Sequence, residues 1–373
     1  MRLAITGARG FMGSNLRVRL GEQGHTDIVC VPHDATDAEL ATLLHGADLV
    51  YHLAGVNRPP SPDDYQQGNA GFTERLCRTL TALPKAPALA YASSTQAALD
   101  NAYGRSKLAA EQAVQAYGQA TGADVHVYRL PNVFGKWSSP NYNSAVATFC
   151  HNVARDLPIT VNDPAAPLRL VYIDDVTDAL CTLAGPLAKP SAEGYAQVVP
   201  VYDTTVGEIA RTIQGFRTSR DTLVTDRVGA GLVRALYATY VSFLPVSSFG
   251  YEVPRHGDAR GVFVEMLKTP DCGQFSYFTA HPGVTRGEHY HHTKTEKFLV
   301  IKGTAHFGFR HIVTDERHGL VVEGGSGQIV ETVPGWTHNI SNIGQDELIV
   351  MLWANEIFDR DRPDTTANKV DRS

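Results

Sequence analysis

The sequence predicts two regions of different fold class: an α/β region built on a parallel sheet over residues 1–245, and an all-β region over residues 250–373. Through the first region, short apolar runs alternate with helix-like segments, which is typical of a parallel sheet covered by helices. After Pro245, helical periodicity disappears and strand-like alternation replaces it. Nine of the fifteen histidines lie between His256 and His338, so the second region also differs in its chemistry.

Length and composition limit the possible classes of protein. A chain of 373 residues suggests about two domains, and 43% hydrophobic residues suffice for a sizeable core. The net charge of −6 gives no reason to expect nucleic acid or an anionic membrane as a partner. No apolar run approaches the roughly 18 residues of a membrane span, and glycines interrupt the N-terminal stretch that a signal peptide needs. The five scattered cysteines suggest reduced thiols, so we expect a soluble, cytoplasmic protein without membrane insertion.

The strands of the first region are expected at five apolar runs, which are Leu3 to Thr6, Ile28 to Val31, Leu49 to Leu53, Leu89 to Ser93 and Val125 to Arg129. The first helix begins near Phe11 and carries Met12, Leu16 and Leu20 at four-residue spacing, which is a stripe that faces the core. A helical stretch around residues 207–214 is expected to complete the substrate lobe of this region.

The segment TGARGFMG follows the first predicted strand directly and opens the first helix. Its glycines, Gly7, Gly10 and Gly13, suit a tight turn, a close approach of a pyrophosphate to the backbone, and close packing of the helix on the strand. An anion then binds at the helix N-terminus, where Phe11 and Met12 form the first turn. We therefore expect a dinucleotide cofactor here.

Tyr103 and Lys107 are four residues apart, so they share one face of a predicted helix. An ammonium near the phenol lowers the pKa of the phenol from its ordinary value of about 10, and such a phenol can protonate the oxygen of a carbonyl under reduction. Ser94, at the end of the preceding strand, is expected to hydrogen-bond the same oxygen. An exposed helix face is the alternative for a lone Tyr-x-x-x-Lys pair, but its position after the fourth strand and the glycine turn favours a reductase site.

These segments, with His52-Leu53-Ala54-Gly55 and the motif RLPNVFG from Arg129 to Gly135, resemble the extended short-chain dehydrogenase/reductases that act on nucleotide sugars. The resemblance covers nearly all of residues 1–240 and implies a Rossmann-like fold. It implies a catalytic triad of Ser94, Tyr103 and Lys107, with Ser93 or Thr95 as alternatives to Ser94.

The same resemblance implies further contacts. The cofactor is expected at Leu53, Ala54 and Gly55, and the substrate at Asn132. Arg169 either meets the substrate diphosphate or forms a salt bridge with Asp174 or Asp175.

The stretch from Asp27 to Leu40 is short for this family, so a strand and a helix are expected to be missing. Asp34 is then expected near the adenine, and the usual acidic selector for the ribose 2′-hydroxyl has no clear counterpart. Arg9, within the glycine turn, is a candidate for a 2′-phosphate, with His33 assisting. These residues favour NADP(H) over NAD(H).

The second region has the spacing of a β-barrel metal site. Gly283, His289, His291, Glu296 and Gly303 match the first motif of the cupins, and the segment from Gly335 to Asn342, which contains His338, resembles the second motif. The resemblance implies a jelly-roll fold in which His289, His291, Glu296 and His338 bind a metal. Imidazoles with one carboxylate suit Zn²⁺ with an open coordination position, although iron, manganese or nickel would also fit. His292, His306, His311 and His318 are expected to lie outside the site.

The stretch RGEHY from Arg286 to Tyr290 resembles the cupin epimerases of deoxysugar synthesis, whose base matches His289. A histidine does not easily serve as metal ligand and free base together. Either His289 binds the metal and another group is the base, or the metal set is His291, Glu296 and His338. Lys297 is a candidate to stabilise the enolate oxygen.

Both regions together resemble the bifunctional enzymes of capsular polysaccharide synthesis, as in the segments NAYGRSK and HHTKTEKFLV. That resemblance implies C3 epimerisation of a UDP-linked 2-acetamido-2,6-dideoxy-4-ketohexose by the cupin. NADPH-dependent C4 reduction then gives UDP-N-acetyl-L-talosamine, a precursor of N-acetyl-L-fucosamine. It also implies one Zn²⁺ per cupin domain and a homodimer. Two alternatives remain: a non-catalytic cupin for sugar binding or dimerisation, and an Fe(II) dioxygenase, against which the epimerase-like segment argues.

Overall fold

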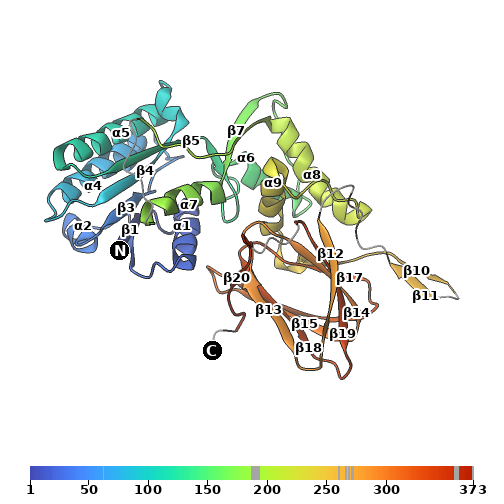
Figure 1. Ribbon diagram of the computed structural model, residues 1–373. Helices are drawn as coiled ribbons and strands as arrows, with labels where there is room; N and C mark the ends of the chain where they lie inside the picture. The colour runs from blue at the N-terminus through green and yellow to red at the C-terminus, as the bar shows by residue number, and fades with distance from the viewer. Residues whose placement is uncertain are drawn as a thin grey trace. The chain divides into compact units, whose positions relative to one another are not determined.

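The computed structural model describes residues 1–61, 63–185, 194–258, 261–264, 267, 269, 273–356 and 361–371. The chain divides into two compact units: Met1–Ser144 with Leu168–Thr204, and Ala145–Pro167 with Thr205–Ser373 (Figure 1). This division differs from the expected boundary near residue 245. The reason is that α8 (Val206–Thr222) and α9 (Gly231–Ser242) pack on one another and form ion pairs with the all-β region of the second unit.

The first unit contains the expected parallel sheet. Its strands run in the order β2 (Ile28–Val31), β1 (Leu3–Thr6), β3 (Leu49–His52), β4 (Ala88–Ser94) and β5 (Val125–Leu130), and every pair is parallel. The order agrees with the expectation of a missing strand, because the six-stranded dinucleotide fold has a further strand outside β2. In this chain β2 is an edge strand and leads into α2 (Asp37–Leu44), which begins with a capping box formed by Thr36 and Glu39.

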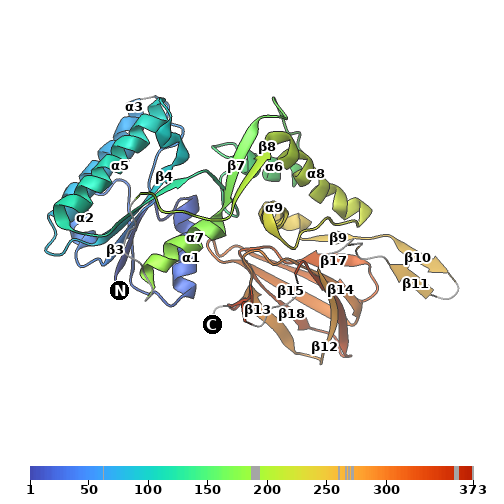
Figure 2. The same ribbon diagram turned by 45° about the horizontal axis from the view of Figure 1, so that its top comes forward.

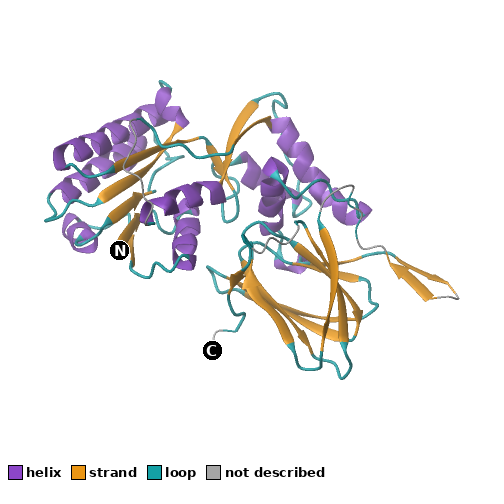
Figure 3. Ribbon diagram, viewed as in Figure 1, coloured by secondary structure: helices purple, strands orange, loops and turns teal. Residues whose placement is uncertain are grey.

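Helices cover both faces of this sheet, as Figure 3 shows. On one face, Ala4, Val50 and Leu89 pack against the apolar sides of α2, α4 (Phe72–Thr81) and α5 (Ala102–Thr121). On the other face, Ile5 and Tyr51 pack against α1 (Phe11–Glu22) and α7 (Ile173–Cys181). Shorter elements connect them: α3 (Asp63–Tyr65), the π-helix η1 (Gln66–Gly71), and the 3₁₀ helices η2 (Thr95–Ala98) and η3 (Thr182–Ala184). The α/β prediction is confirmed.

A small sheet and several helices follow the main sheet along the chain. The sheet has the order β6 (Asn132–Phe134), β7 (Pro167–Tyr172) and β8 (Val201–Thr205), and β6 and β7 are parallel. In the second unit, α6 (Ala145–Val153) packs against α8 and α9, and α8 contains the helical stretch expected around residues 207–214. A single 3₁₀ turn, η4 (Val246–Ser248), then leads to the strands.

The second unit contains the expected all-β region, drawn in orange and red in Figure 2. One five-stranded antiparallel sheet has the order β12 (Gln274–Ala280), β19 (Leu348–Ala354), β14 (Glu296–Lys302), β17 (Gln328–Glu331) and β9 (Gly250–Glu252). The other has the order β16 (Arg317–Glu323), β15 (Thr304–His311), β18 (Trp336–Asn342), β13 (Thr285–Tyr290) and β20 (Thr366–Ala367). A separate hairpin joins β10 (Arg255–Asp258) to β11 (Gly261–Val264).

The two antiparallel sheets face one another around a common interior. Phe298 and Leu352 of the first sheet and Phe307 and Ile340 of the second line the same cavity. This arrangement of two sheets is that of a cupin-like jelly roll, and the prediction of an all-β second region is confirmed. Among the described helices, none combines the length and the apolar character needed to cross a membrane.

Candidate functional site

The glycine turn between β1 and α1 has the geometry of an anion site. Gly7 has a φ of +67°, and a Cβ atom added there would lie 2.7 Å from the backbone nitrogen of Ala54. A Cβ atom on Gly13 would lie 2.2 Å from the carbonyl oxygen of Gly7. The first turn of α1 has no side-chain cap at Gly10 and contains no acidic residue. Its backbone N–H groups therefore suit a phosphate, and the residues present fit a dinucleotide.

A cavity of about 460 Å³ lies beside this turn. It brings together eleven residues that the sequence predicted: Gly7, Gly10, Phe11, Met12, Gly13, Leu53, Gly55, Ser94, Tyr103, Lys107 and Asn132. Four further predicted residues, Arg9, His33, Asp34 and Ala54, are not among its lining residues. Arg9 is exposed, and the His33 and Asp34 side chains are 90% and 77% exposed. Their proposed roles at the cofactor remain predictions.

Arg169 also lies outside the lining of this cavity. Its guanidinium is 64% exposed and lies 3.6 Å from the carboxylate of Asp203. Asp174, which the sequence offered as its partner, instead binds the buried ammonium of Lys136 at 2.5 Å. Arg169 therefore pairs with Asp203 and not with Asp174, because β7 and β8 are neighbouring strands.

Ser94 and Tyr103, the predicted hydrogen-bond donor and proton donor, form a pair that lines the cavity. The hydroxyl of Ser93 donates to the buried carboxylate of Glu111 at 2.5 Å, whereas Ser94 lines the cavity and its hydroxyl accepts from the backbone N–H of Gln96 at 3.2 Å. The geometry therefore favours Ser94 over Ser93 as the group that meets a substrate oxygen. Thr95 also lines the cavity, at the start of η2.

Lys107 is buried beneath this pair. Its ammonium donates to the carbonyl oxygen of Ala92 at 2.8 Å and lies 4.6 Å from the centre of the Tyr91 ring. Burial lowers the pKa of Lys107 to about 7, and burial also raises the pKa of Tyr103 above its ordinary value. The expected lowering of the Tyr103 pKa is thus wrong for this structure, because desolvation of the phenol outweighs the opposing influence of Ser94. The Tyr103 phenol is therefore neutral at pH 7 and has a proton to donate.

Glu111 was not predicted from the sequence, although its side chain contacts several residues next to Ser94 and Lys107. Its carboxylate is buried and binds the guanidinium of Arg129 at 2.6 Å, the hydroxyl of Ser93 at 2.5 Å and that of Tyr195 at 3.2 Å. Through its charge it also favours the protonated form of Lys107. The available signal was its spacing, because Glu111 lies one helical turn beyond Lys107 on the same face of α5.

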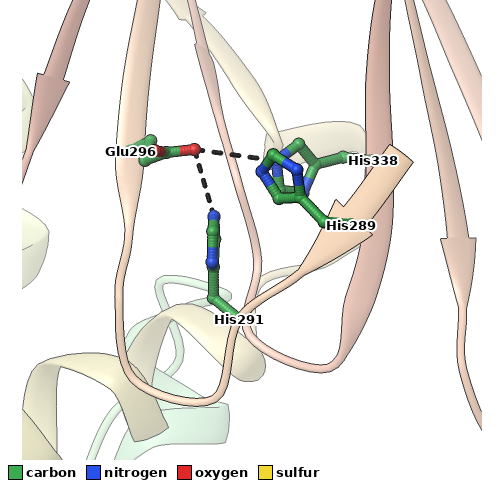
Figure 4. Close-up of side chains that lie close together, drawn as sticks. All are labelled: His289, His291, Glu296 and His338. Carbon is green, nitrogen blue, oxygen red and sulfur yellow. Dashed lines mark hydrogen bonds and ion pairs between the residues drawn. The ribbon is translucent and has the colours of Figure 1, made fainter. Parts of the chain in front are cut away.

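In the second unit, His289, His291, Glu296 and His338 converge as Figure 4 shows. Their candidate ligand atoms all lie within 4.8 Å of one another. The Oε2 atom of Glu296 lies 3.2 Å from Nε2 of His291 and 3.6 Å from Nε2 of His338. The four excluded histidines, His292, His306, His311 and His318, do not belong to this group, which we call the His/Glu cluster.

Local structure aims these four side chains at one point. His289 comes from the end of β13, after an irregularity at Gly287 and Glu288, whose φ values are +95° and +60°. Such a bulge turns the following side chain relative to the regular strand. His291 and Glu296 flank the loop to β14, and His338 comes from β18.

The electrostatics of the His/Glu cluster suit a cation. Burial and the neighbouring imidazoles lower the pKa of His289 to about 3, and burial lowers the pKa of His338. Burial opposes ionisation of Glu296, but His291, His338 and Lys294 hold the pKa of its carboxyl well below the ordinary value. Neither ring nitrogen of His338 has a hydrogen-bond partner in the described part of the chain. Neutral imidazoles around an ionised carboxylate fit a divalent metal such as Zn²⁺.

The His/Glu cluster opens onto a cavity of about 170 Å³ inside the barrel. His289, Glu296 and His338 line it, together with Arg286. The remaining wall is largely apolar and includes the rings of Phe278, Phe298, Phe307 and Phe309. A small molecule can therefore reach the cluster, as a catalytic metal site requires and a sealed structural site does not.

Lys297 does not join this site, so its expected contact with an enolate oxygen is wrong. Side chains alternate along a strand, and Lys297 points to the face of β14 opposite Glu296. There its buried ammonium binds the carboxylate of Glu331, which also binds Arg220 of α8. The Lys297 ammonium lies 3.2 Å from the hydroxyl of Tyr251 as well. The lysine near the His/Glu cluster is Lys294, whose ammonium lies 3.2 Å from Oε1 of Glu296.

Known proteins match both units of the chain. Residues 3–193 match the NAD dependent epimerase/dehydratase family, and residues 256–366 match the polysaccharide biosynthesis C-terminal domain. A UDP-2-acetamido-2,6-beta-L-arabino-hexul-4-ose reductase of Pseudomonas aeruginosa is 54% identical over 370 residues, which cover 99% of each chain.

Solved structures are similar as well. The capsular polysaccharide assembling protein CapF of Staphylococcus aureus has 39% identity and a TM-score of 0.68, over 99% of this chain and 100% of that one. The enzyme WbmF of Bordetella bronchiseptica covers 58% of this chain and 77% of its own, with a TM-score of 0.53 and 20% identity. At that identity the likeness to WbmF concerns the fold alone.

Proposed function

Because the chain belongs to the NAD dependent epimerase/dehydratase family, we propose that it is a nucleotide-sugar reductase and epimerase of surface polysaccharide synthesis. Its substrate is a UDP-linked 2-acetamido-2,6-dideoxy-4-ketohexose. The match to the polysaccharide biosynthesis C-terminal domain and the likeness to the P. aeruginosa reductase support this assignment. The observation that carries it is the meeting of Ser94, Tyr103 and Lys107 with the glycine turn in one cavity.

The first unit performs the reduction at C4 of the sugar. Ser94 donates a hydrogen bond to the C4 ketone oxygen, and Tyr103 gives its phenolic proton to that oxygen as it becomes a hydroxyl. Lys107, held under the pair by the carbonyl of Ala92, favours the phenolate that remains on Tyr103. Asn132 contacts the sugar and Arg169 the diphosphate. NADPH, when bound, supplies the hydride.

The preference for NADPH rests on the residues around the glycine turn. β2 ends at Val31 and is followed by Pro32, so the position of the usual acidic selector has no carboxylate. The exposed Arg9 guanidinium is free to bind a 2′-phosphate, with His33 assisting and Asp34 near the adenine. Leu53, Ala54 and Gly55 contact the remainder of the cofactor.

The second unit performs the epimerisation at C3. The His/Glu cluster holds one Zn²⁺ per cupin domain, and the adjoining cavity receives the ketosugar. The ligand atoms of His289 lie within 4.8 Å of those of the other three members, which supports its role as a ligand, and another group then removes the C3 proton. A metal ion at this site supplies Lewis acidity for the C4 ketone oxygen.

The order of the two reactions follows from the chemistry of the ketone. The C4 ketone acidifies the C3 proton, and reduction removes that ketone. Epimerisation therefore precedes reduction, and the product is UDP-N-acetyl-L-talosamine. The enzyme acts as a homodimer.

One experiment separates the two activities. The ketosugar is incubated with the full-length protein in D₂O without NADPH, and the sugar is analysed by mass spectrometry and NMR. Deuterium at C3 is expected. If no deuterium enters while added NADPH is still oxidised, the second unit is a sugar-binding or dimerisation module and the epimerase assignment fails.

A further inference from the structure

The loop between β13 and β14 carries two members of the His/Glu cluster, His291 at its start and Glu296 at its end. Asp364, more than sixty residues away in sequence, binds the backbone of this loop. Its carboxylate accepts from three consecutive N–H groups, those of His292 at 2.9 Å, Thr293 at 2.6 Å and Lys294 at 2.7 Å. It also accepts from the Thr293 hydroxyl at 2.9 Å. Successive N–H groups that converge on one carboxylate form a tight anion-binding nest, so the loop has little freedom.

Asp364 also determines which nitrogen of His291 faces the His/Glu cluster. The backbone carbonyl oxygen of Asp364 lies 2.5 Å from Nδ1 of His291. A carbonyl oxygen only accepts hydrogen bonds, so Nδ1 carries the proton. Nδ1 is therefore committed to Asp364, and Nε2 is the nitrogen left to bind a metal; it faces Glu296 at 3.2 Å. A hydrogen bond of this kind fixes the tautomer and the ring orientation of a metal-binding histidine.

The next residue, Thr365, acts on the other end of the loop. Its hydroxyl lies 3.3 Å from the ammonium of Lys294. That ammonium lies 3.2 Å from Oε1 of Glu296, so this oxygen already has a partner. The other oxygen, Oε2, faces His291 and His338. Lys294 thus presents the carboxylate to the cluster through a single oxygen.

The C-terminal segment is anchored where these contacts require it. β20 begins at Thr366, directly after Thr365, and pairs with the end of β13, so that Ala367 lies opposite His289. From α9, the Arg234 guanidinium binds Glu356 at 2.9 Å and also binds the hydroxyl of Thr293. The same guanidinium lies 4.0 Å from the carboxylate of Asp364, so it contacts both the loop and the segment.

We infer that Asp364 and Thr365 are positioning residues of the metal site: Asp364 sets the tautomer and loop conformation of His291, and Thr365, through Lys294, sets the monodentate presentation of Glu296. The inference rests on the proposed metal site. It makes the segment after the last long strand of the barrel part of that site, although neither Asp364 nor Thr365 belongs to the His/Glu cluster.

The test measures metal affinity rather than turnover. Zn²⁺ is titrated into the full-length, metal-free protein in competition with a chromophoric chelator. Asp364→Asn keeps the backbone carbonyl at His291 but removes the charge that binds the loop N–H groups, and it is expected to weaken Zn²⁺ binding by about 10-fold. Thr365→Val is expected to weaken it by several-fold. Substitution with Co²⁺ adds a spectroscopic signature, and we expect both variants to shift its visible absorption bands because the ligand geometry changes.

Asp371→Asn is the matched control. It removes an ion pair of the same segment, that of Asp371 with Arg317 at 2.6 Å, in which the Asp371 side chain is 83% exposed. Its Zn²⁺ affinity and Co²⁺ spectrum are expected to equal those of the wild type. Circular dichroism and thermal unfolding of all variants report whether the second unit is folded, and Thr365→Val serves if Asp364→Asn does not fold.

The outcomes are distinct. If the wild type binds one Zn²⁺ and both variants bind it equally tightly with an unchanged Co²⁺ spectrum, the positioning role is refuted while the metal site stands. If the wild type itself binds no metal, the proposed metal site fails, and the inference fails with it.

Discussion

The two candidate sites of this chain use different parts of the polypeptide. In the first unit, backbone N–H groups at an uncapped helix end suit an anion, and the adjoining cavity of about 460 Å³ has room for a large ligand. In the second unit, three buried side chains and the half-buried His289 meet beside a cavity of about 170 Å³. The first site therefore depends on the absence of side chains at Gly7 and Gly13, and the second on the convergence of side chains from three strands and a loop.

Burial also acts differently on the charges of the two sites. In the first, burial lowers the pKa of Lys107 to about 7 beside a neutral phenol, which suits proton transfer near neutral pH. In the second, burial keeps His289 and His338 neutral while their neighbours keep Glu296 ionised, which suits the binding of a cation. The comparison indicates that one site is organised for proton transfer and the other for holding a metal.

Tyr103→Phe tests whether reduction belongs to the first site alone. Loss of the phenolic proton is expected to slow NADPH oxidation by about 10³-fold, within the usual range for a general acid. Deuterium exchange at C3 is expected to continue unchanged, measured by mass spectrometry. Tyr65→Phe is the control, because Tyr65 contacts the Tyr103 ring while its hydroxyl donates to the carbonyl of Asn57. Loss of both activities in Tyr103→Phe would contradict the division of labour.

His338→Ala tests the metal assignment of the second site. Removal of one of four ligands is expected to weaken Zn²⁺ binding at least 100-fold and to abolish C3 exchange, while reduction of a C3-epimerised substrate persists. Metal content is measured by elemental analysis after dialysis. His318 lies outside the His/Glu cluster, so the control variant His318→Ala should keep the metal content of the wild type. An unchanged metal content in His338→Ala would remove that residue from the ligand set.

Lys297→Met tests whether this lysine is structural. Its ammonium binds Glu331 in the protein interior, so its loss leaves that carboxylate with Arg220 alone and is expected to cost about 3 kcal/mol of unfolding free energy. Denaturant unfolding measures the loss. Arg217→Met, which removes exposed ion pairs of the same helix α8, should cost less than about 1 kcal/mol. If Lys297→Met folds normally but no longer exchanges the C3 proton, Lys297 takes part in epimerisation and the structural assignment is wrong.

Arg9→Ala tests the choice of cofactor. If the Arg9 guanidinium binds a 2′-phosphate, its loss is expected to raise the KM for NADPH by about tenfold and to leave the KM for NADH unchanged. Steady-state kinetics with both cofactors measure this ratio. Arg17→Ala, on the exposed side of α1, is the control. An equal effect on both cofactors would refute the proposed role.

Lys107→Met tests the burial of charge in the first site. The pKa of Lys107 is about 7 in the folded chain and about 10.5 when exposed, so the folded state carries an energetic penalty below pH 7 that declines as the pH rises toward 10.5. The variant is therefore expected to be more stable than the wild type at pH 7, on the order of 1 kcal/mol, although it loses the bond to Ala92. Thermal unfolding at pH 7 and pH 10 measures the difference. If the stability of Lys107→Met relative to the wild type increased with pH, the pKa of Lys107 would be raised in the folded state and not lowered.

Local sequence was sufficient for much of the fold and for parts of both sites. The five parallel strands were predictable because each is a short apolar run, and the glycine turn because few other residues fit a φ of +67° or the contact of Gly13 with the backbone of Gly7. The pair at Tyr103 and Lys107 and the cluster members His289, His291 and Glu296 were also within reach, because helix and strand periodicities relate residues a few positions apart.

Long-range packing decided the remainder. The direction of Lys297, the ion pair of Arg169 with Asp203, and the raised pKa of Tyr103 depend on neighbours far away in the chain. The hydrogen bonds between Asp364 and the loop after β13 also join residues that are distant in the chain. Such contacts are set by which strands become neighbours and how deeply a group is buried, and neither quantity has a period that a single sequence reveals. Periodicity describes what an element does by itself, whereas burial and partner choice exist only once the elements have packed.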